Sequence, residues 1–170
     1  MDKQQLIIEQ IPKLRRYARA LTGNAALADD LVQDCLERAW SRFHLWQPGS
    51  NIRAWMFTIM HNCYANFVRK NKHQPSLVTI EDWGGDAQVA PNQENAAELR
   101  DVVAAIRQLP AEQREVLLLV GLEELTYAEA AKVLGIPLGT VMSRLSRGRE
   151  KLRAILTQRP LIAGVRQVGD

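Results

Sequence analysis

Basic residues gather in the last third of this 170-residue chain. Between Thr126 and Arg159 seven cations stand against only two carboxylates, Glu129 and Glu150, whereas the whole chain carries a net charge of +3. The seven cations are Lys132, Arg144, Arg147, Arg149, Lys151, Arg153 and Arg159. A local excess of this kind is typical of a surface that binds phosphates, although a solvated helix face would carry the same charges.

A second group of residues with binding chemistry lies in the first half of the sequence. Trp55, Asn62, Asn66 and Arg69 are separated by seven, four and three positions. On a helix this spacing places an aromatic ring, two amides and a cation along one side. By spacing alone, a half-buried Trp with polar neighbours in solvent is the simpler interpretation.

Cysteines and histidines give little support for a metal site or an enzyme. His61 and Cys63 could supply two zinc ligands, with Cys35 and His44 or His73 as further ones, but no paired CxxC or HxxxH spacing accompanies them. A Cys with a His is also the best catalytic combination, and neither an acidic orienting residue nor an oxyanion-hole motif joins it. We therefore expect two buried free thiols, no metal, no cofactor and no catalytic residue.

Helical periodicity runs along both ends of the chain and disappears between them. Prolines, a Gly-Gly pair and carboxylates without basic neighbours fill residues 73–95. The sequence predicts an all-α fold of two small helical domains, residues 1–72 and 96–158, joined by this flexible acidic linker and followed by a tail, 159–170. The apolar runs are too short to span a bilayer, and the N-terminus lacks a signal-peptide pattern, so we expect a cytoplasmic protein.

Capping residues predict where the helices of the first domain begin and end. Pro12 suits the first turn of a helix that stops at Gly23, and Asn24 caps the next helix. Ser50 or Asn51 can cap a long helix from Ile52 to about Lys70. The helix after Asn24 should bury the apolar stripe Leu27, Leu31, Val32, Cys35, Leu36, Ala39, Trp40 and Phe43. Its opposite side gathers Asp29, Asp30, Gln33 and Glu37.

The second domain contains the pattern of a helix-turn-helix. Residues 126–129 fit a capping box, and Gly135 stops the helix that begins there. A second helix follows Pro137, buries Val141, Leu145 and Leu152, and leaves its polar residues outside. Two helices that cross closely through a tight turn, with a basic outer side, indicate DNA binding; a helix pair without a nucleic-acid partner is the alternative.

Taken together, these segments resemble the extracytoplasmic-function (ECF) sigma factors of bacterial RNA polymerase. LADDLVQD at residues 27–34, continued by Arg38-Ala39-Trp40, is similar to their region 2.2, and residues 52–62 are similar to regions 2.3 and 2.4. Leu109-Pro110, REV at 114–116, YAEAA at 127–131 and residues 139–144 are similar to regions 4.1 and 4.2. Two independent signatures in the right order make the resemblance specific.

The resemblance implies three binding surfaces. The surface that docks the clamp helices of the largest polymerase subunit would be Asp29, Asp30, Gln33, Asp34 and Glu37. The surface for the minus-ten DNA element would be Arg53, Trp55, Asn62, Asn66, Arg69 and Lys70, and Asn62 would help hold a flipped base. The surface for the minus-35 element would be Thr140, Met142, Ser143, Arg144, Ser146 and Arg147. Many members carry Arg where this chain has Met142, which leaves promoter preference open.

The same resemblance implies the partners: core RNA polymerase, promoter DNA and an anti-sigma factor that is often attached to the membrane. Occlusion by such a partner is favoured over inhibition by the linker, because an acidic linker has little apolar surface with which to hold itself against either domain. The two domains should then be free to reorient. A conventional helix-turn-helix regulator, which binds duplex DNA without polymerase, is the alternative function.

Overall fold

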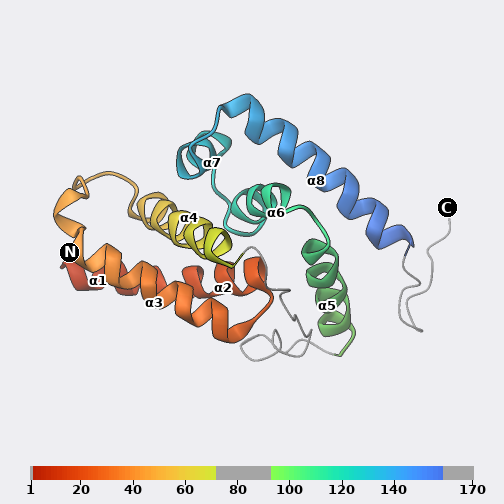
Figure 1. Cartoon of the computed structure of the whole chain (residues 1–170), viewed down its shortest axis with the longest axis horizontal. Helices are drawn as coiled ribbons and strands as arrows, with labels where there is room; N and C mark the ends of the chain where they lie inside the picture. Colours follow the sequence, from red (N-terminus) through yellow and green to blue (C-terminus); the bar gives the residue numbers. More distant parts are fainter. Residues whose placement is uncertain (1, 72–92, 159–170) are drawn as a thin grey trace.

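The computed structural model describes residues 2–71 and 93–158, and every element within these two stretches is a helix (Figure 1). The first stretch, here the first half, contains α1 (Lys3–Ile8), α2 (Ile11–Thr22), α3 (Ala25–Ser41), the short 3-10 turn η1 (Phe43–Leu45) and α4 (Ile52–Lys70). The second half contains α5 (Gln93–Arg107), α6 (Ala111–Leu117), the π-helical turn η3 (Leu118–Leu122), α7 (Tyr127–Leu134) and α8 (Leu138–Gln158). The predicted all-α fold is confirmed.

The capping residues act as the sequence predicts. Gly23 ends α2 with φ 66°, the left-handed conformation that glycine adopts without steric cost. The side chains of Asn24 and Asn51 accept hydrogen bonds from the third backbone N–H of α3 and of α4. Thr126 and Glu129 form the reciprocal capping box of α7. Local chemistry therefore sets the start of these helices.

The core of the first half lies between α2, α3 and α4. Tyr17 of α2 meets Phe57 of α4 edge to face, with ring centroids 5.1 Å apart, and Leu14 and Met60 are fully buried as well. The predicted burial of Trp40 is wrong, because this residue is 52% exposed. The apolar stripe of α3 is wider than the surface its neighbours cover.

The second half is built around the contact of α8 with α6 and α7. Gly148 is buried there, and a Cβ atom on it would lie 3.4 Å from the Cβ of Gln113 on α6. Gly135 turns the chain between α7 and α8 with φ 66°. Val141 and Leu145 are buried as predicted, whereas Leu152 is only partly buried. The crossing of α7 and α8 fixes the outer side of α8 as a rigid surface.

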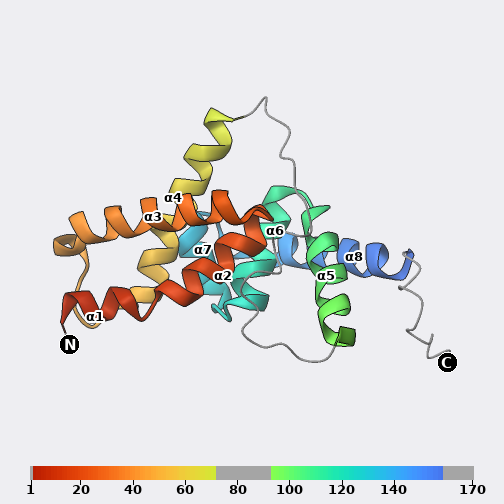
Figure 2. The ribbon, with the colours of Figure 1, turned by 90° about the horizontal axis from the view of Figure 1, so that it is seen from below.

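The two halves pack directly against each other. Helix α4 lies against α7, and α2 lies against η3 and α5, as the two perpendicular views in Figures 1 and 2 show. Their buried side chains belong to one continuous hydrophobic cluster. The sequence pattern carried no sign of this core shared between the two halves. Most of the predicted linker and the tail after residue 158 lie outside the described residues.

Candidate nucleic-acid interface

An acidic face covers the outer side of α3. Buried residues such as Leu31 and Cys35 turn the opposite side of the helix inward. The carboxylates and the amide of the predicted polymerase-docking surface are therefore all exposed: Asp29, Asp30, Gln33, Asp34 and Glu37. Asp29 stands apart from the rest, because its Oδ1 lies 3.9 Å from Nη2 of Arg19 on α2. The remaining three carboxylates line one exposed ridge.

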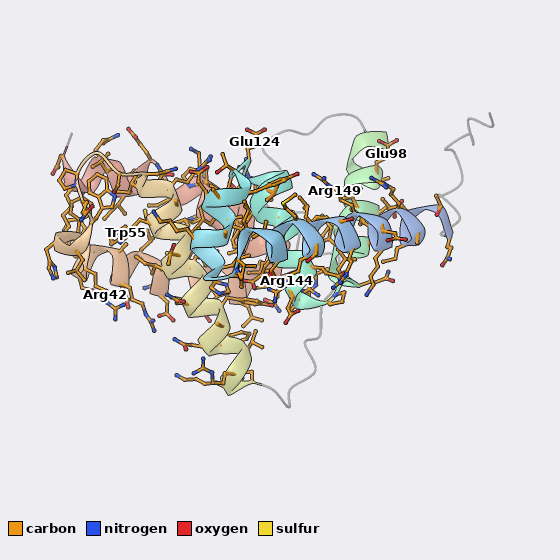
Figure 3. The ribbon with its side chains drawn as sticks, turned by 90° about the horizontal axis from the view of Figure 1, so that it is seen from above. Arg42, Trp55, Glu98, Glu124, Arg144 and Arg149 are labelled. Carbon is orange, nitrogen blue, oxygen red and sulfur yellow. The ribbon has the colours of Figure 1, made fainter. Side chains whose placement is uncertain are left out.

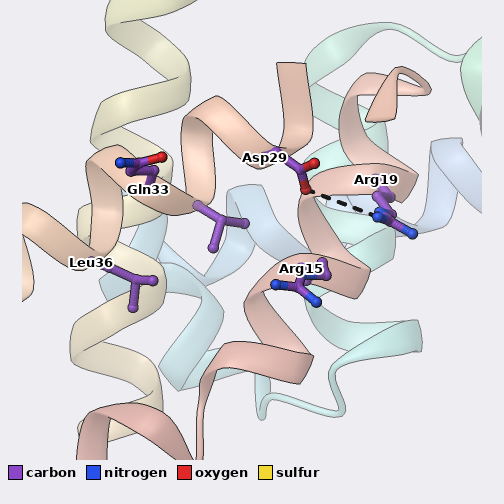
Figure 4. Close-up of a pocket in the computed structure, with 6 residues that line it drawn as sticks. Arg15, Arg19, Asp29, Gln33 and Leu36 are labelled. Atoms are coloured by element: carbon purple, nitrogen blue, oxygen red, sulfur yellow. Dashed lines mark ion pairs between the residues drawn. The ribbon is translucent and has the colours of Figure 1, made fainter. Parts of the chain in front are cut away.

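A shallow groove runs between this ridge and α2. Its walls carry Arg15 and Arg19 from α2, with Asp29 and Gln33 from α3, and Val32 and Leu36 supply apolar surface (Figure 4). The groove therefore combines apolar surface with side chains of both charges. Its two arginines and one carboxylate give it a different charge from the acidic ridge beside it.

The candidate minus-ten residues of α4 lie in three different environments. Trp55 is half-buried and meets Phe43 edge to face, with centroids 6.2 Å apart, and Phe43 in turn contacts Trp46. Asn62 is exposed in the middle of the helix. Asn66, Arg69 and Lys70 lie on the end of α4 that projects past α3 (Figure 2). Amides and two cations thus lie along the same helix as a fixed aromatic ring. This combination of side chains is suited to binding single-stranded nucleic acid.

The structure shows two features of α4 that the spacing of its residues in the sequence could not predict. The aromatic cluster that holds Trp55 in place comes from η1 and the residue after it. The density of aromatic residues between 43 and 55 in the sequence could have indicated this cluster. Arg53 is half-buried in the first turn of α4. The pKa of Glu129 on α7 is lowered chiefly by the hydrogen bond from the Thr126 backbone N–H, and the positive charge of Arg53 contributes to the same lowering.

The predicted minus-35 residues spread over the first turns of α8. Met142, Ser143, Ser146 and Arg147 are exposed, and Thr140 is half-buried. Arg144 differs, because its guanidinium lies 3.8 Å from the Glu112 carboxylate of α6 and its side chain is only 27% exposed. Figure 3 shows Arg144 and Arg149 on opposite sides of α8. The helix therefore presents an open central face flanked by cations, which is the form of a major-groove reading helix.

Both cysteines are free and buried, as the sequence predicts. The Cys35 thiol donates to the Met56 carbonyl over 3.5 Å, and burial raises the pKa of both thiols. Within residues 2–71 and 93–158 no three His, Cys, Asp or Glu side chains gather in a way that could hold a metal. His73, one of the possible zinc ligands, lies outside the described residues. Buried thiols with raised pKa values are poor nucleophiles.

Comparison with known proteins finds a matching family for each half and relatives that match most of the chain. Residues 7–61 match the family described as the Sigma2 domain of PhyR, and residues 99–152 match Sigma-70, region 4. Over 154 residues the chain is 40% identical to the ECF RNA polymerase sigma factor EcfG of Rhodopseudomonas palustris, and the match covers 88% of this chain and 82% of that relative. The chain belongs to the ECF sigma factor family. ECF sigma factors are transcription factors without enzymatic activity.

Two solved structures share the fold of this chain. The sigma factor RpoE in complex with the anti-sigma factor NepR from Bartonella quintana is 33% identical, with a TM-score of 0.75 over 91% of this chain and 96% of that one. CnrH in complex with the cytosolic domain of CnrY is 27% identical, with a TM-score of 0.69 over 91% and 87%. No helix in the described part of this ECF sigma factor is long and apolar enough to cross a membrane.

Proposed function

We propose that this ECF sigma factor docks on the clamp helices of the largest RNA polymerase subunit through the acidic face of α3. Asp30, Asp34 and Glu37 are exposed there in a row. We further propose that α4 reads the minus-ten element as unpaired DNA and that α8 reads the minus-35 element in the major groove. The observation that carries the proposal is the separation of chemistries: carboxylates on α3, amides with cations on α4, and hydroxyls with cations on α8.

The test is whether promoter recognition depends on polymerase. Purified protein with core enzyme should start transcripts from a specific promoter, found by mapping transcript starts after forced expression. The protein alone should bind the same duplex weakly, since the minus-ten surface suits unpaired bases. High-affinity binding to duplex promoter DNA without core enzyme would support the conventional regulator instead.

Asn62→Ala should lower open-complex formation and change minus-ten preference. Its amide is exposed on α4, where it can donate to and accept from the edge of an extruded base. Core binding should stay at the parent level, because Asn62 lies on a different helix from the acidic face. Permanganate reactivity of unpaired thymines on a series of base-substituted promoters gives the readout. Equal profiles for variant and parent across that series would remove Asn62 from base reading.

Arg144 and Arg147 should behave differently when each is replaced by Ala. Arg147 is exposed on the central face of α8, so its loss should change sequence preference by about 1–3 kcal/mol. Arg144 leans toward Glu112 at the edge, where a phosphate contact is favoured. Its loss should weaken all sequences alike and reduce the salt slope by about one. Affinity of the holoenzyme for minus-35 variants over a range of salt concentrations measures both quantities, and the reverse assignment would contradict this geometry.

We also propose that an anti-sigma factor controls this protein in the cytoplasm and could hold it at the membrane. The support comes from RpoE and CnrH, which were solved with NepR and with the cytosolic domain of CnrY. A protein that co-purifies with this sigma factor should displace core polymerase, and its deletion should raise expression from the target promoter. If core polymerase still bound in its presence, occlusion would not be the mode of control.

A further inference from the structure

Two large apolar side chains lie exposed at the start of α8. Leu138 is 47% exposed and Met142 is 51% exposed, whereas Val141 and Leu145 of the same helix are buried in the hydrophobic core. The packing of α8 against α6 and α7 therefore does not account for Leu138 and Met142. A single exposed apolar residue is ordinary, but two neighbours within a candidate binding surface indicate that the surface has an apolar contact to make.

The two side chains lie on one side of α8. Leu138 and Met142 are four positions apart, so they are neighbours on the helix surface. Arg149 follows Met142 by seven positions, which places this exposed cation two turns further along the same side. Figure 3 shows Arg149 on the opposite side of α8 from Arg144, which contacts Glu112. Leu138 and Met142 therefore form an apolar strip on the side of α8 away from that contact.

The apolar strip borders the polar face of α8. Ser146 is exposed and follows Met142 by four positions, so its hydroxyl lies one turn beyond the thioether. The exposed Arg147 is the next residue, and it faces the centre of the surface. The Ser143 hydroxyl, also exposed, donates to the Thr140 carbonyl at 3.2 Å within the helix. Apolar and hydrogen-bonding side chains thus lie side by side on the helix that the proposed function places in the major groove.

The major groove offers the apolar strip one apolar partner. Each base pair presents hydrogen-bond donors and acceptors there, and thymine adds its C5-methyl group. A thioether is at most a weak acceptor, so Met142 cannot pair with the two acceptors that guanine presents, as an arginine would. Its unbranched and polarisable side chain is instead suited to packing against a small apolar group.

The charge around the apolar strip favours DNA over a protein partner. Between residues 126 and 159 seven cations stand against two carboxylates, which complements a phosphate backbone. The strip also lies in the first turns of α8, and the N-terminal residues of a recognition helix are the ones that contact base edges. Two side chains are few for the apolar core of a stable protein interface, which typically buries about 800 Å² on each partner.

We infer that Met142 reads a thymine of the minus-35 element through the C5-methyl group, and that Leu138 shields this methyl group from water. The inference rests on the proposed insertion of α8 into the major groove, and it names the base that one position of the helix selects. Thymine is favoured over cytosine at that position, because cytosine lacks the methyl group and presents an amino group to the thioether. The promoter preference that the sequence left open at Met142 is thereby assigned.

The first experiment removes only the methyl group. Deoxyuridine pairs like thymidine but lacks the C5-methyl, so it tests this contact without changing any hydrogen bond in the groove. Each thymine of the mapped minus-35 element, on either strand, is replaced in turn by deoxyuridine, and the affinity of the holoenzyme is measured. Replacement at one position should weaken binding by about four-fold, the loss expected when one buried methyl group is removed.

The second experiment couples that base to Met142. Met142→Ala should weaken binding to the thymine promoter by about four-fold, and it should make deoxyuridine at the sensitive position silent. Met142→Leu keeps an apolar contact and should retain the deoxyuridine effect, whereas Met142→Arg should lose it and prefer guanine there. The matched control is Tyr127→Ala, which removes a 38% exposed apolar side chain from α7. This control should keep the four-fold deoxyuridine effect.

Two results would overturn the methyl contact. One is a minus-35 element whose thymines all tolerate deoxyuridine, and the other is a deoxyuridine effect that persists unchanged in Met142→Ala. If Met142→Ala instead lowered the affinity for core polymerase or for a co-purifying protein, with the deoxyuridine effects intact, the apolar strip would belong to a protein interface.

Failure of the proposed function has a different signature. Tight binding of the protein alone to promoter duplex would favour the conventional regulator, and the same deoxyuridine series on that duplex would still test Met142. A protein that recognised no promoter, with or without core enzyme, would refute both the proposed function and the methyl contact.

Discussion

Reversing two charges on the acidic face, with Asp30→Lys and Glu37→Lys together, is expected to abolish stable association with core polymerase. Both carboxylates are exposed on α3, so the change leaves the buried side of the helix untouched. Like charges placed across an interface oppose binding where opposite charges had favoured it, and the loss of paired charges costs about 2–5 kcal/mol. The affinity for core enzyme should therefore fall by about 100-fold or more. Competition with a labelled parent protein for core enzyme gives the number.

Two further measurements make this result specific. The Glu9→Lys/Glu98→Lys protein changes the net charge equally at exposed positions just after α1 and on α5, and it should bind core enzyme like the parent. Far-ultraviolet circular dichroism should be the same for the parent and both double variants, because none of the four positions is buried. Equal loss of binding in both double variants would point to net charge rather than to the acidic face of α3.

The features that the sequence predicted well depend on residues close together in the chain. The caps at Asn24, Asn51 and Thr126 each bond to a backbone N–H three residues later, and Gly23 and Gly135 each end a helix locally. The spacing of apolar residues likewise fixes which side of α3 faces solvent. For that reason both the helices and the exposure of the acidic face could be predicted from one sequence.

The features that the sequence missed depend on partners far apart in the chain. Arg16 and Glu123 are 107 positions apart, and His61 and Glu115 are 54 apart, so no local pattern links them. Exposure can be missed for the same reason, since periodicity gives the direction of the Trp40 side chain but not the extent of the neighbour that would cover it. The turn of Arg144 toward α6 is also set by a residue on another helix, Glu112.

Arg114 illustrates how one residue of the family-like motif holds the end of α5 against α6. Its guanidinium donates to three carbonyls around the end of α5, those of Ile106, Arg107 and Leu109, at 3.2, 2.9 and 2.9 Å, and also reaches the Leu21 carbonyl. The last carbonyls of a helix have no partner within it, so they need donors from elsewhere. Arg114 supplies these donors and joins α5 to α6.

Arg114→Met should therefore lower the stability of the protein more than the charge reversals at Asp30 and Glu37. The Met side chain keeps apolar bulk but removes every donor, and bonds to a charged group contribute about 1.5–3 kcal/mol. With several carbonyls affected, we expect a loss of about 3 kcal/mol in the free energy of unfolding and a melting temperature lower by about 10 °C. Arg114→Lys should recover part of this loss, and Arg100→Met, an exposed change on α5, should have almost no effect. An Arg114→Met protein that melts at the parent temperature would show that water satisfies these carbonyls equally well.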